Sequence, residues 1–255
     1  MFTPEQLTRY DRNLRIPGIG EAGQARLAQA SVAVVGLGGL GSPVALYLAA
    51  AGVGTLGLID SDAVEMSNLQ RQVLHTTDRI GVSKVDSAVE TLVRLNPEIR
   101  LVPLPVRMNH SNAAELLTSF DAVVEATDNF EAKFLINDTC LVLRKPFATA
   151  GILALSGQAL FCVPGQTPCL RCAVPEVPQG VPTTAQLGVL GAVPGLLGSL
   201  EALDSIRYLA GLWAPEEDGS GWIHSVQSDA PGGVRLKTMR INRRAHCRCA
   251  ALWPE

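Results

Sequence analysis

The chain has 255 residues and a mass of 27.0 kDa, enough to bury a full hydrophobic core, and we expect one domain over residues 1–255. Its net charge of −3 and its isoelectric point near 5.8 leave no basic surplus for binding nucleic acid or an anionic membrane. Residues 1–15 carry several charges and no apolar run, which argues against a secretory signal and favours a cytoplasmic protein.

An uncharged stretch over residues 27–59 is long enough for a membrane span, but glycines and a proline interrupt it. It is better explained by a buried strand at 32–35, a glycine-rich turn, a helix at 43–51 and a second buried strand at 55–59. Each piece is too short to cross a bilayer, so we expect no membrane span here.

The rest of the chain alternates helical and strand patterns. We predict helices at 82–95, after 129 up to 143, and at 194–212, and strands at 121–126, 146–152, 158–163, 222–227 and 234–240. Residues 165–193 are rich in proline, glycine and threonine and are the best candidate for a lid. This order predicts an α/β fold: a Rossmann-like, mostly parallel sheet with helices on both faces, extended by C-terminal antiparallel strands.

A glycine-rich turn follows the first predicted strand. Gly36, Gly38 and Gly41 satisfy G-x-G-x-x-G between a strand and a helix, and Gly39 adds a further position without a Cβ atom. Such a loop lets the backbone approach a phosphate at a helix N-terminus. Asp60 ends the next strand, where it can accept hydrogen bonds from ribose hydroxyls. Taken alone, this pattern suits NAD as well as ATP.

Further polar residues favour a triphosphate over a dinucleotide. Arg71 and Lys84 add two cations that a dinucleotide's pyrophosphate does not usually need. Arg71 belongs to the string Ser67-Asn68-Leu69-Gln70-Arg71-Gln72. Asp128 and Asn129 follow the strand at 121–126, where strand ends meet a ligand crevice, and Asp128 is a candidate ligand for Mg²⁺. The sequence therefore predicts an ATP site.

Six cysteines in a chain without a recognisable export signal indicate metal binding or chemistry rather than disulfides. Cys169 and Cys172 form a C-x-x-C pair, and Cys247 and Cys249 lie near the C-terminus, so a four-coordinate structural Zn²⁺ could join the two segments. His246 stays an alternative ligand, because the gap between Cys247 and Cys249 is one residue rather than two. A redox role for the first pair is disfavoured, because the flanking prolines do not suggest a helix start.

Together, the glycine loop, Asp60, the string from Ser67 to Arg71, Lys84 and the run Ala126-Thr127-Asp128-Asn129 resemble the MoeB/ThiF family, relatives of the ubiquitin-activating enzymes. The resemblance covers essentially the whole chain. It implies that Gly39 approaches the nucleotide, that Asp60 binds ribose, and that Asn68, Arg71 and Lys84 stabilise the triphosphate. It also implies that Asp128 holds Mg²⁺, and it brings a zinc-binding element into the expected fold.

The N-terminal arm over residues 1–30 adds to the resemblance. Its segment Arg9-Tyr10-Asp11-Arg12-Asn13 is similar to the arm of the family, which implies a homodimer in which Arg12 reaches the partner subunit's phosphates. Residues 31–145 are then expected to form the nucleotide-binding half, and residues 146–255 the carrier-binding and zinc-bearing half.

The function that the resemblance implies is adenylation. ATP would activate the C-terminal glycine of a ubiquitin-like sulfur carrier ending in Gly-Gly, as an acyl-adenylate, with release of pyrophosphate. The carrier of molybdopterin biosynthesis is the first expectation and the thiamine-pathway carrier the alternative. Thr184 stands where some relatives have a cysteine for covalent transfer, which favours a protein that only adenylates, and no sulfurtransferase domain is expected after Glu255.

Two other functions stay open from the sequence. An NAD(P)-binding oxidoreductase fits the glycine loop alone, and nicotinamide binding without ATP binding would establish it. An adenylating relative that modifies tRNA is disfavoured by the acidic charge balance.

Overall fold

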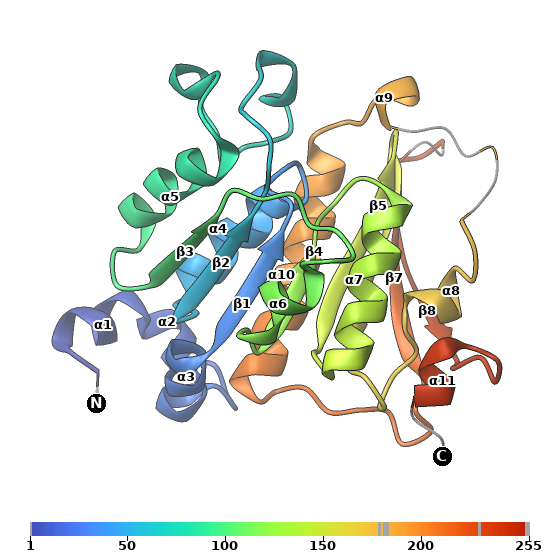
Figure 1. Cartoon of the computed structure of the whole chain (residues 1–255). Helices are drawn as coiled ribbons and strands as arrows, with labels where there is room; N and C mark the ends of the chain where they lie inside the picture. The colour runs from blue at the N-terminus through green and yellow to red at the C-terminus, as the bar shows by residue number, and fades with distance from the viewer. Residues whose placement is uncertain (1, 178–179, 181–183, 229–230, 253–255) are drawn as a thin grey trace.

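One eight-stranded sheet runs through the molecule in the order β3-β2-β1-β4-β5-β6-β7-β8 (Figure 1). The computed structural model describes residues 2–177, 180, 184–228 and 231–252. The strands are β1 (Ser31–Val35), β2 (Thr55–Ile59), β3 (Arg100–Leu104), β4 (Ala122–Glu125), β5 (Phe147–Leu153), β6 (Ser156–Cys162), β7 (Gly221–Gln227) and β8 (Arg235–Ile241).

The pairing of the strands changes from parallel to antiparallel at β5. The strands β3, β2, β1, β4 and β5 pair in parallel, whereas β6, β7 and β8 join by antiparallel pairing. Residues 32–35 of β1 are all buried, as expected for a central strand that is covered on both faces. The expected Rossmann-like sheet with a C-terminal antiparallel extension is therefore confirmed.

Helices cover both faces of the sheet (Figure 1). They are α1 (Pro4–Arg9), α2 (Asp11–Leu14), α3 (Gly20–Gln29), α4 (Gly41–Ala51), α5 (Lys84–Leu95), α6 (Ala113–Thr118), α7 (Phe130–Leu143), α8 (Leu170–Ala173), α9 (Thr184–Leu187), α10 (Ala192–Ala210) and α11 (Arg248–Leu252). Val32 and Val34 share a core with residues of α3, α4, α5 and α10, while Ala33 and Val35 share another with residues of α6 and α7. Alternate side chains of β1 thus pack against the two helical layers.

The helices and strands expected from residue 32 onward are found within a few residues of their predicted ends. The last long helix begins at Ala192 and ends at Ala210, because Gly211 adopts a left-handed conformation with φ of 81° and stops it. The segment 165–193, the candidate lid, contains the short helices α8 and α9, and its residues 178–179 and 181–183 lie outside the described part of the chain. In the part of the chain that the structure describes, no helix is both long and apolar enough to cross a membrane.

Candidate active site

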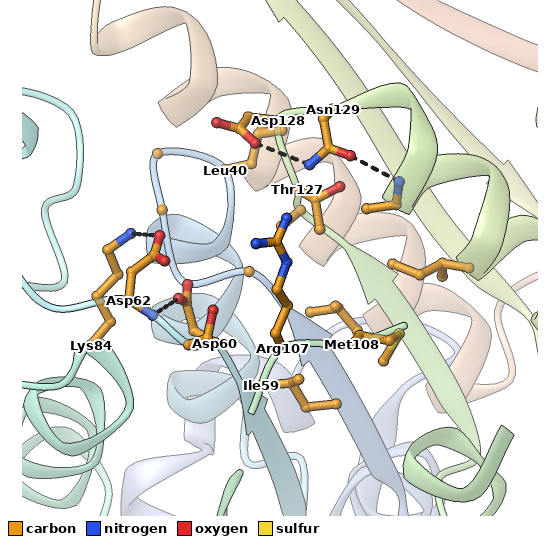
Figure 2. Close-up of a pocket in the computed structure, with 18 of the residues that line it drawn as sticks. Leu40, Ile59, Asp60, Asp62, Lys84, Arg107, Met108, Thr127, Asp128 and Asn129 are labelled. Atoms are coloured by element: carbon orange, nitrogen blue, oxygen red, sulfur yellow. Dashed lines mark hydrogen bonds and ion pairs between the residues drawn. The ribbon is translucent and has the colours of Figure 1, made fainter. Parts of the chain in front are cut away.

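A cavity of about 390 Å³ opens at the carboxyl ends of β1, β2 and β4, beside the glycine loop (Figure 2). This is where ligands bind in open parallel sheets, since strand ends and helix N-termini converge there. Most of the predicted nucleotide residues line it, namely Gly36, Gly38, Gly39, Asp60, Arg71, Lys84, Asp128 and Asn129. Residues far apart in the sequence are thus brought to one site.

The glycines of the loop have two different tasks. Gly36 has φ of 94°, and a Cβ atom built on Gly41 would lie 1.9 Å from the carbonyl oxygen of Gly36, so both are required by the turn itself. Gly38 and Gly39 face the cavity, where added Cβ atoms would meet only side chains at 3.3 Å or more. The first pair closes the turn, and the second pair leaves its backbone open to a ligand.

Asp60 is fixed directly beside this loop. Its carboxylate accepts hydrogen bonds from the backbone N–H of Leu37 at 2.7 Å and of Asp62 at 2.9 Å. A carboxylate has about four acceptor positions, so about two remain for a ligand. The arrangement suits paired hydroxyls such as those of a ribose.

Of the residues that the structure describes, three cations line the cavity. Lys84, the first residue of α5, is 5% exposed, and its Nζ lies 2.9 Å from Asp62 Oδ2. The guanidinium of Arg71 donates to the backbone oxygen of Ser67 at 3.1 Å and to Asn68 Oδ1 at 2.9 Å. Arg107, which the sequence did not single out, projects between Asp60 and Asn129 (Figure 2). These charges suit a polyphosphate.

Several predicted residues do not line the cavity. Ser67 and Asn68 instead accept hydrogen bonds from the guanidinium of Arg71. Gln70 donates to the backbone oxygen of Val189 at 3.4 Å. Leu69 and Gly41 are likewise absent from the lining. The side chain of Arg12 is 86% exposed, pairs with Asp11 at 3.7 Å, and does not line the cavity of its own chain.

A buried carboxylate shapes the loop that carries Asp128. Glu125, at the end of β4, accepts hydrogen bonds from the backbone N–H of Thr127 at 2.8 Å and from its hydroxyl at 2.5 Å. Lys133 Nζ at 2.8 Å and the Thr149 hydroxyl at 2.5 Å bind its other oxygen. Asn129 caps α7 by accepting from the N–H of Ala132 at 2.9 Å. Asp128 is left exposed at the cavity.

Gln72 is a second residue whose part in the site was missed. It lines the cavity and is 5% exposed, yet its Oε1 has no hydrogen-bond partner among the described residues. A Cβ atom on Gly38 would lie 3.5 Å from its Nε2, so the amide lies against the glycine loop. A buried amide without a partner costs free energy, which a bound ligand would offset.

The four predicted zinc ligands form one buried cluster. The Sγ atoms of Cys169, Cys172, Cys247 and Cys249 all lie within 4.8 Å of one another. Three of the separations are 3.5 Å, 3.4 Å and 4.0 Å. Tetrahedral zinc with bonds of about 2.3 Å requires sulfur atoms about 3.8 Å apart, so the donor set fits that ion. His246 is exposed and is not in the cluster.

The other two cysteines are buried in α7 and β6. Burial raises the pKa of the Cys140 and Cys162 thiols above the ordinary value of 9.0. A thiol that stays protonated is a poor nucleophile, so these residues serve packing.

Related proteins are found by comparison of the whole sequence. The ThiF family matches residues 10–251. The sulfur carrier protein adenylyltransferase of Thermus thermophilus is 45% identical over 221 residues, covering 84% of this chain and 82% of that protein. Adenylyltransferase and sulfurtransferase MOCS3 of Xenopus laevis is 44% identical over 220 residues, covering 86% of this chain and 49% of that protein. The chain thus spans about half the length of this relative.

A solved structure gives the same fold. The crystal structure of E. coli MccB with MccA-N7isoASN aligns with a TM-score of 0.81 at 23% identity, over 95% of this chain and 74% of that one. At this identity the likeness extends to the fold alone.

Proposed function

Because the chain belongs to the ThiF family, we propose that it is an ATP-dependent adenylyltransferase that activates the C-terminal glycine of a ubiquitin-like sulfur carrier. The observation that carries the proposal is the convergence of the glycine loop, three cations and Asp128 on one cavity. The names of the two relatives above support the same activity. The glycine loop and Asp60 alone would also suit a nicotinamide dinucleotide, but the cations and the additional acid favour a triphosphate.

The proposed step is an in-line displacement at the α-phosphorus of ATP. A carboxylate oxygen of the carrier's terminal glycine forms a bond to that phosphorus, and the bond from phosphorus to the oxygen shared with the β-phosphate breaks. Pyrophosphate leaves with the electron pair, and the charge is stabilised by Arg71, Lys84 and Arg107. The attacking carboxylate is already ionised, so the step needs neither a base nor a protein nucleophile.

We assign Asp128 as the residue that would hold Mg²⁺. Its carboxylate is exposed at the cavity, and its only hydrogen bond in the described structure is a 3.4 Å contact from Asn129 Nδ2. Hard oxygen donors suit this ion. Mg²⁺ would supply charge neutralisation at the phosphates, and the turn at Thr127, fixed by Glu125, keeps the carboxylate in place for it.

We also propose a structural Zn²⁺ at Cys169, Cys172, Cys247 and Cys249, supported by their separations and burial. Such an ion would tie the segment after β6 to the chain after β8. In this division residues 31–145 hold the nucleotide, and residues 146–255 hold the metal and the carrier.

Two experiments test the adenylation proposal. The protein is incubated with ATP, Mg²⁺ and either the molybdopterin-pathway carrier, which we place first, or the thiamine-pathway carrier, and mass spectrometry looks for the acyl-adenylate. Exchange of labelled pyrophosphate into ATP should require a carrier ending in Gly-Gly. Exchange without a carrier, or binding of nicotinamide dinucleotide in place of ATP, would refute the proposal.

We propose a homodimer in which Arg12 completes the partner's site. An exposed apolar surface supports it: Tyr47 of α4 and Leu196 and Leu203 of α10 are 56%, 37% and 51% exposed, and these helices pack against each other. Mixing inactive Arg12→Ala and Asp128→Ala variants should restore about a quarter of the wild-type exchange rate, because half of the dimers would be mixed and each would hold one intact site. No recovery on subunit exchange would contradict the shared site.

A further inference from the structure

One carboxylate on α7 binds an arginine next to each of the two cysteine pairs. Asp138 Oδ1 accepts from Arg171 Nε at 2.8 Å, and Oδ2 accepts from Arg171 Nη2 at 3.0 Å and from Arg248 Nη1 at 2.9 Å. Asn137 Nδ2 donates to Oδ1 at 2.9 Å. The side chain of Asp138 is 17% exposed, so these contacts are partly shielded from solvent. Such a paired contact with Arg171 is both strong and directional.

Each of the two arginines lies within one of the cysteine motifs. Arg171 lies between Cys169 and Cys172, and Arg248 lies between Cys247 and Cys249. In sequence, Asp138 is 33 residues from Arg171 and 110 from Arg248. A single side chain therefore joins the two cysteine motifs without itself being a metal ligand.

Other residues of α7 hold the first motif in the same place. Asn137 is fully buried, and its Oδ1 accepts from the backbone N–H of Leu170 at 3.0 Å. The guanidinium carbon of Arg171 lies 4.2 Å from the ring centroid of Phe134. Phe134, Asn137 and Asp138 lie three and four residues apart, which places them on one face of the helix. This face supports the segment that carries Cys169 and Cys172.

The two arginines would also offset the negative charge of a zinc ion bound by four thiolates. Four thiolates around Zn²⁺ carry a net charge of about −2, and such a charge is costly in a buried site. Arg171 and Arg248 bring two positive charges to the cysteine motifs, and the carboxylate of Asp138, which offsets one of these charges, orients both. Residues that orient ligands and neighbouring charges commonly govern how firmly a site holds its metal.

We propose that Asp138 is a positioning residue for the zinc site: it fixes Arg171 and Arg248 so that the two cysteine pairs converge and the bound metal is retained. This role rests on the proposed zinc but is independent of the adenylation chemistry. It concerns metal retention, which can be measured without any turnover.

The test is the rate at which purified, zinc-loaded protein transfers its metal to a chromogenic chelator under native conditions. Asp138→Asn keeps the shape of the side chain and should still bind one equivalent of zinc, but release should be about 10-fold to 100-fold faster than from wild type. The matched control is Asp218→Asn, which breaks an arginine pair of 2.6 Å with Arg240, a residue outside the cluster. Its release rate should equal that of wild type.

A second variant separates positioning from general loosening. Arg248 is 58% exposed, so Arg248→Gln should fold. Its release rate should lie between those of wild type and Asp138→Asn, and the double variant should release zinc no faster than Asp138→Asn alone, because Arg248 would act through Asp138. Wild-type rates for Asp138→Asn, or multiplied effects in the double variant, would overturn the proposal. Absence of zinc from purified wild-type protein would refute the metal site itself. None of these outcomes bears on the adenylation proposal, which carrier-dependent exchange tests separately.

Discussion

The ammonium group of Lys84 lies 2.9 Å from the carboxylate of Asp62, so the buried cation of the candidate site is already paired with an acid at the edge of the cavity. The lysine side chain is 6% exposed and the aspartate side chain 67% exposed. An incoming triphosphate would have to replace Asp62 as the partner of Lys84. Removing Lys84 should therefore hinder the reaction with ATP, whereas removing Asp62 should favour ATP binding.

Lys84→Met should lower carrier-dependent pyrophosphate exchange by about 100-fold to 1,000-fold, because it removes a charge that would stabilise the leaving pyrophosphate. The exchange assay with labelled pyrophosphate measures this loss. Retention of more than half of the wild-type rate would exclude Lys84 from the reaction.

Asp62→Asn should act in the other direction. Removing the competing acid should tighten ATP binding by only about threefold, because the interaction of an exposed carboxylate is screened by water. Titration calorimetry with ATP and Mg²⁺ measures the change. Weaker ATP binding would instead identify Asp62 as a ligand of the nucleotide or of its metal.

Gln72→Leu should separate stability from binding. Removing a buried oxygen without a partner should raise the free energy of unfolding by about 1 kcal/mol in the absence of ligand, and should weaken ATP binding. Urea denaturation and calorimetry measure the two effects.

The matched control is Gln24→Leu, since Gln24 is fully buried but bonded to the backbone oxygen of Ala51 at 2.8 Å and to Asn13 at 3.2 Å. This variant should be destabilised and bind ATP normally. If Gln72→Leu binds ATP as tightly as wild type, the amide has no contact with the nucleotide.

Glu201 should make stability depend on pH. Burial, and then the nearby charge of Glu125, raise the pKa of this carboxyl well above its ordinary value of 4.5, and in the described part of the chain neither oxygen has a hydrogen-bond partner. Above pH 4.5 the unfolded chain has lost a proton that the folded protein keeps. The free energy of unfolding therefore falls as pH rises, by at most about 1.4 kcal/mol per pH unit.

Glu201→Gln removes that titration, so its gain in stability over wild type should be larger at pH 8 than at pH 5. Urea denaturation of both proteins at the two pH values measures it, and other titrating groups cancel in the difference. An equal difference at both values would show that Glu201 is charged in the folded protein.

The amount of bound zinc in single variants distinguishes the candidate zinc ligands from one another. Cys249→Ser should lose most of the bound zinc, because it removes one of four converging thiols, whereas His246→Ala should keep about one equivalent. Inductively coupled plasma mass spectrometry of protein purified without chelator gives the stoichiometry. Loss of zinc in His246→Ala would restore the histidine as a ligand.

The sequence was most informative where local pattern and tertiary environment agree. The strand at 55–59 and the turn from Gly36 to Gly41 were predicted because a fully buried parallel strand is a continuous apolar run and its turn needs glycine. The strand β3 was missed because it is an edge strand, contains Pro103 and is only partly buried, so it shows neither a continuous nor an alternating apolar pattern.

Missing β3 had a consequence for the site. Arg107 lies in the segment that follows this strand, and without the strand nothing in the sequence places that segment at the cavity. Gln72 was passed over for another reason, because only burial shows that its amide lacks a partner. The cysteine cluster needed only residue type and spacing, but the sequence left His246 open, since a one-residue gap does not reveal which side chains face inward.

The cysteine cluster also acts on the chain as a whole. Cys169 and Cys247 are 78 residues apart, and the segment between them contains α10, whose Pro194 lies against Gly39 of the nucleotide loop. A metal held by these thiols would close a long loop and, by analogy with a disulfide of that span, remove conformational entropy worth about 4.5 kcal/mol from the unfolded chain. Chelation would then lower the stability of the fold that carries this loop, so that the supply of metal would govern the lifetime of the folded protein rather than its chemistry.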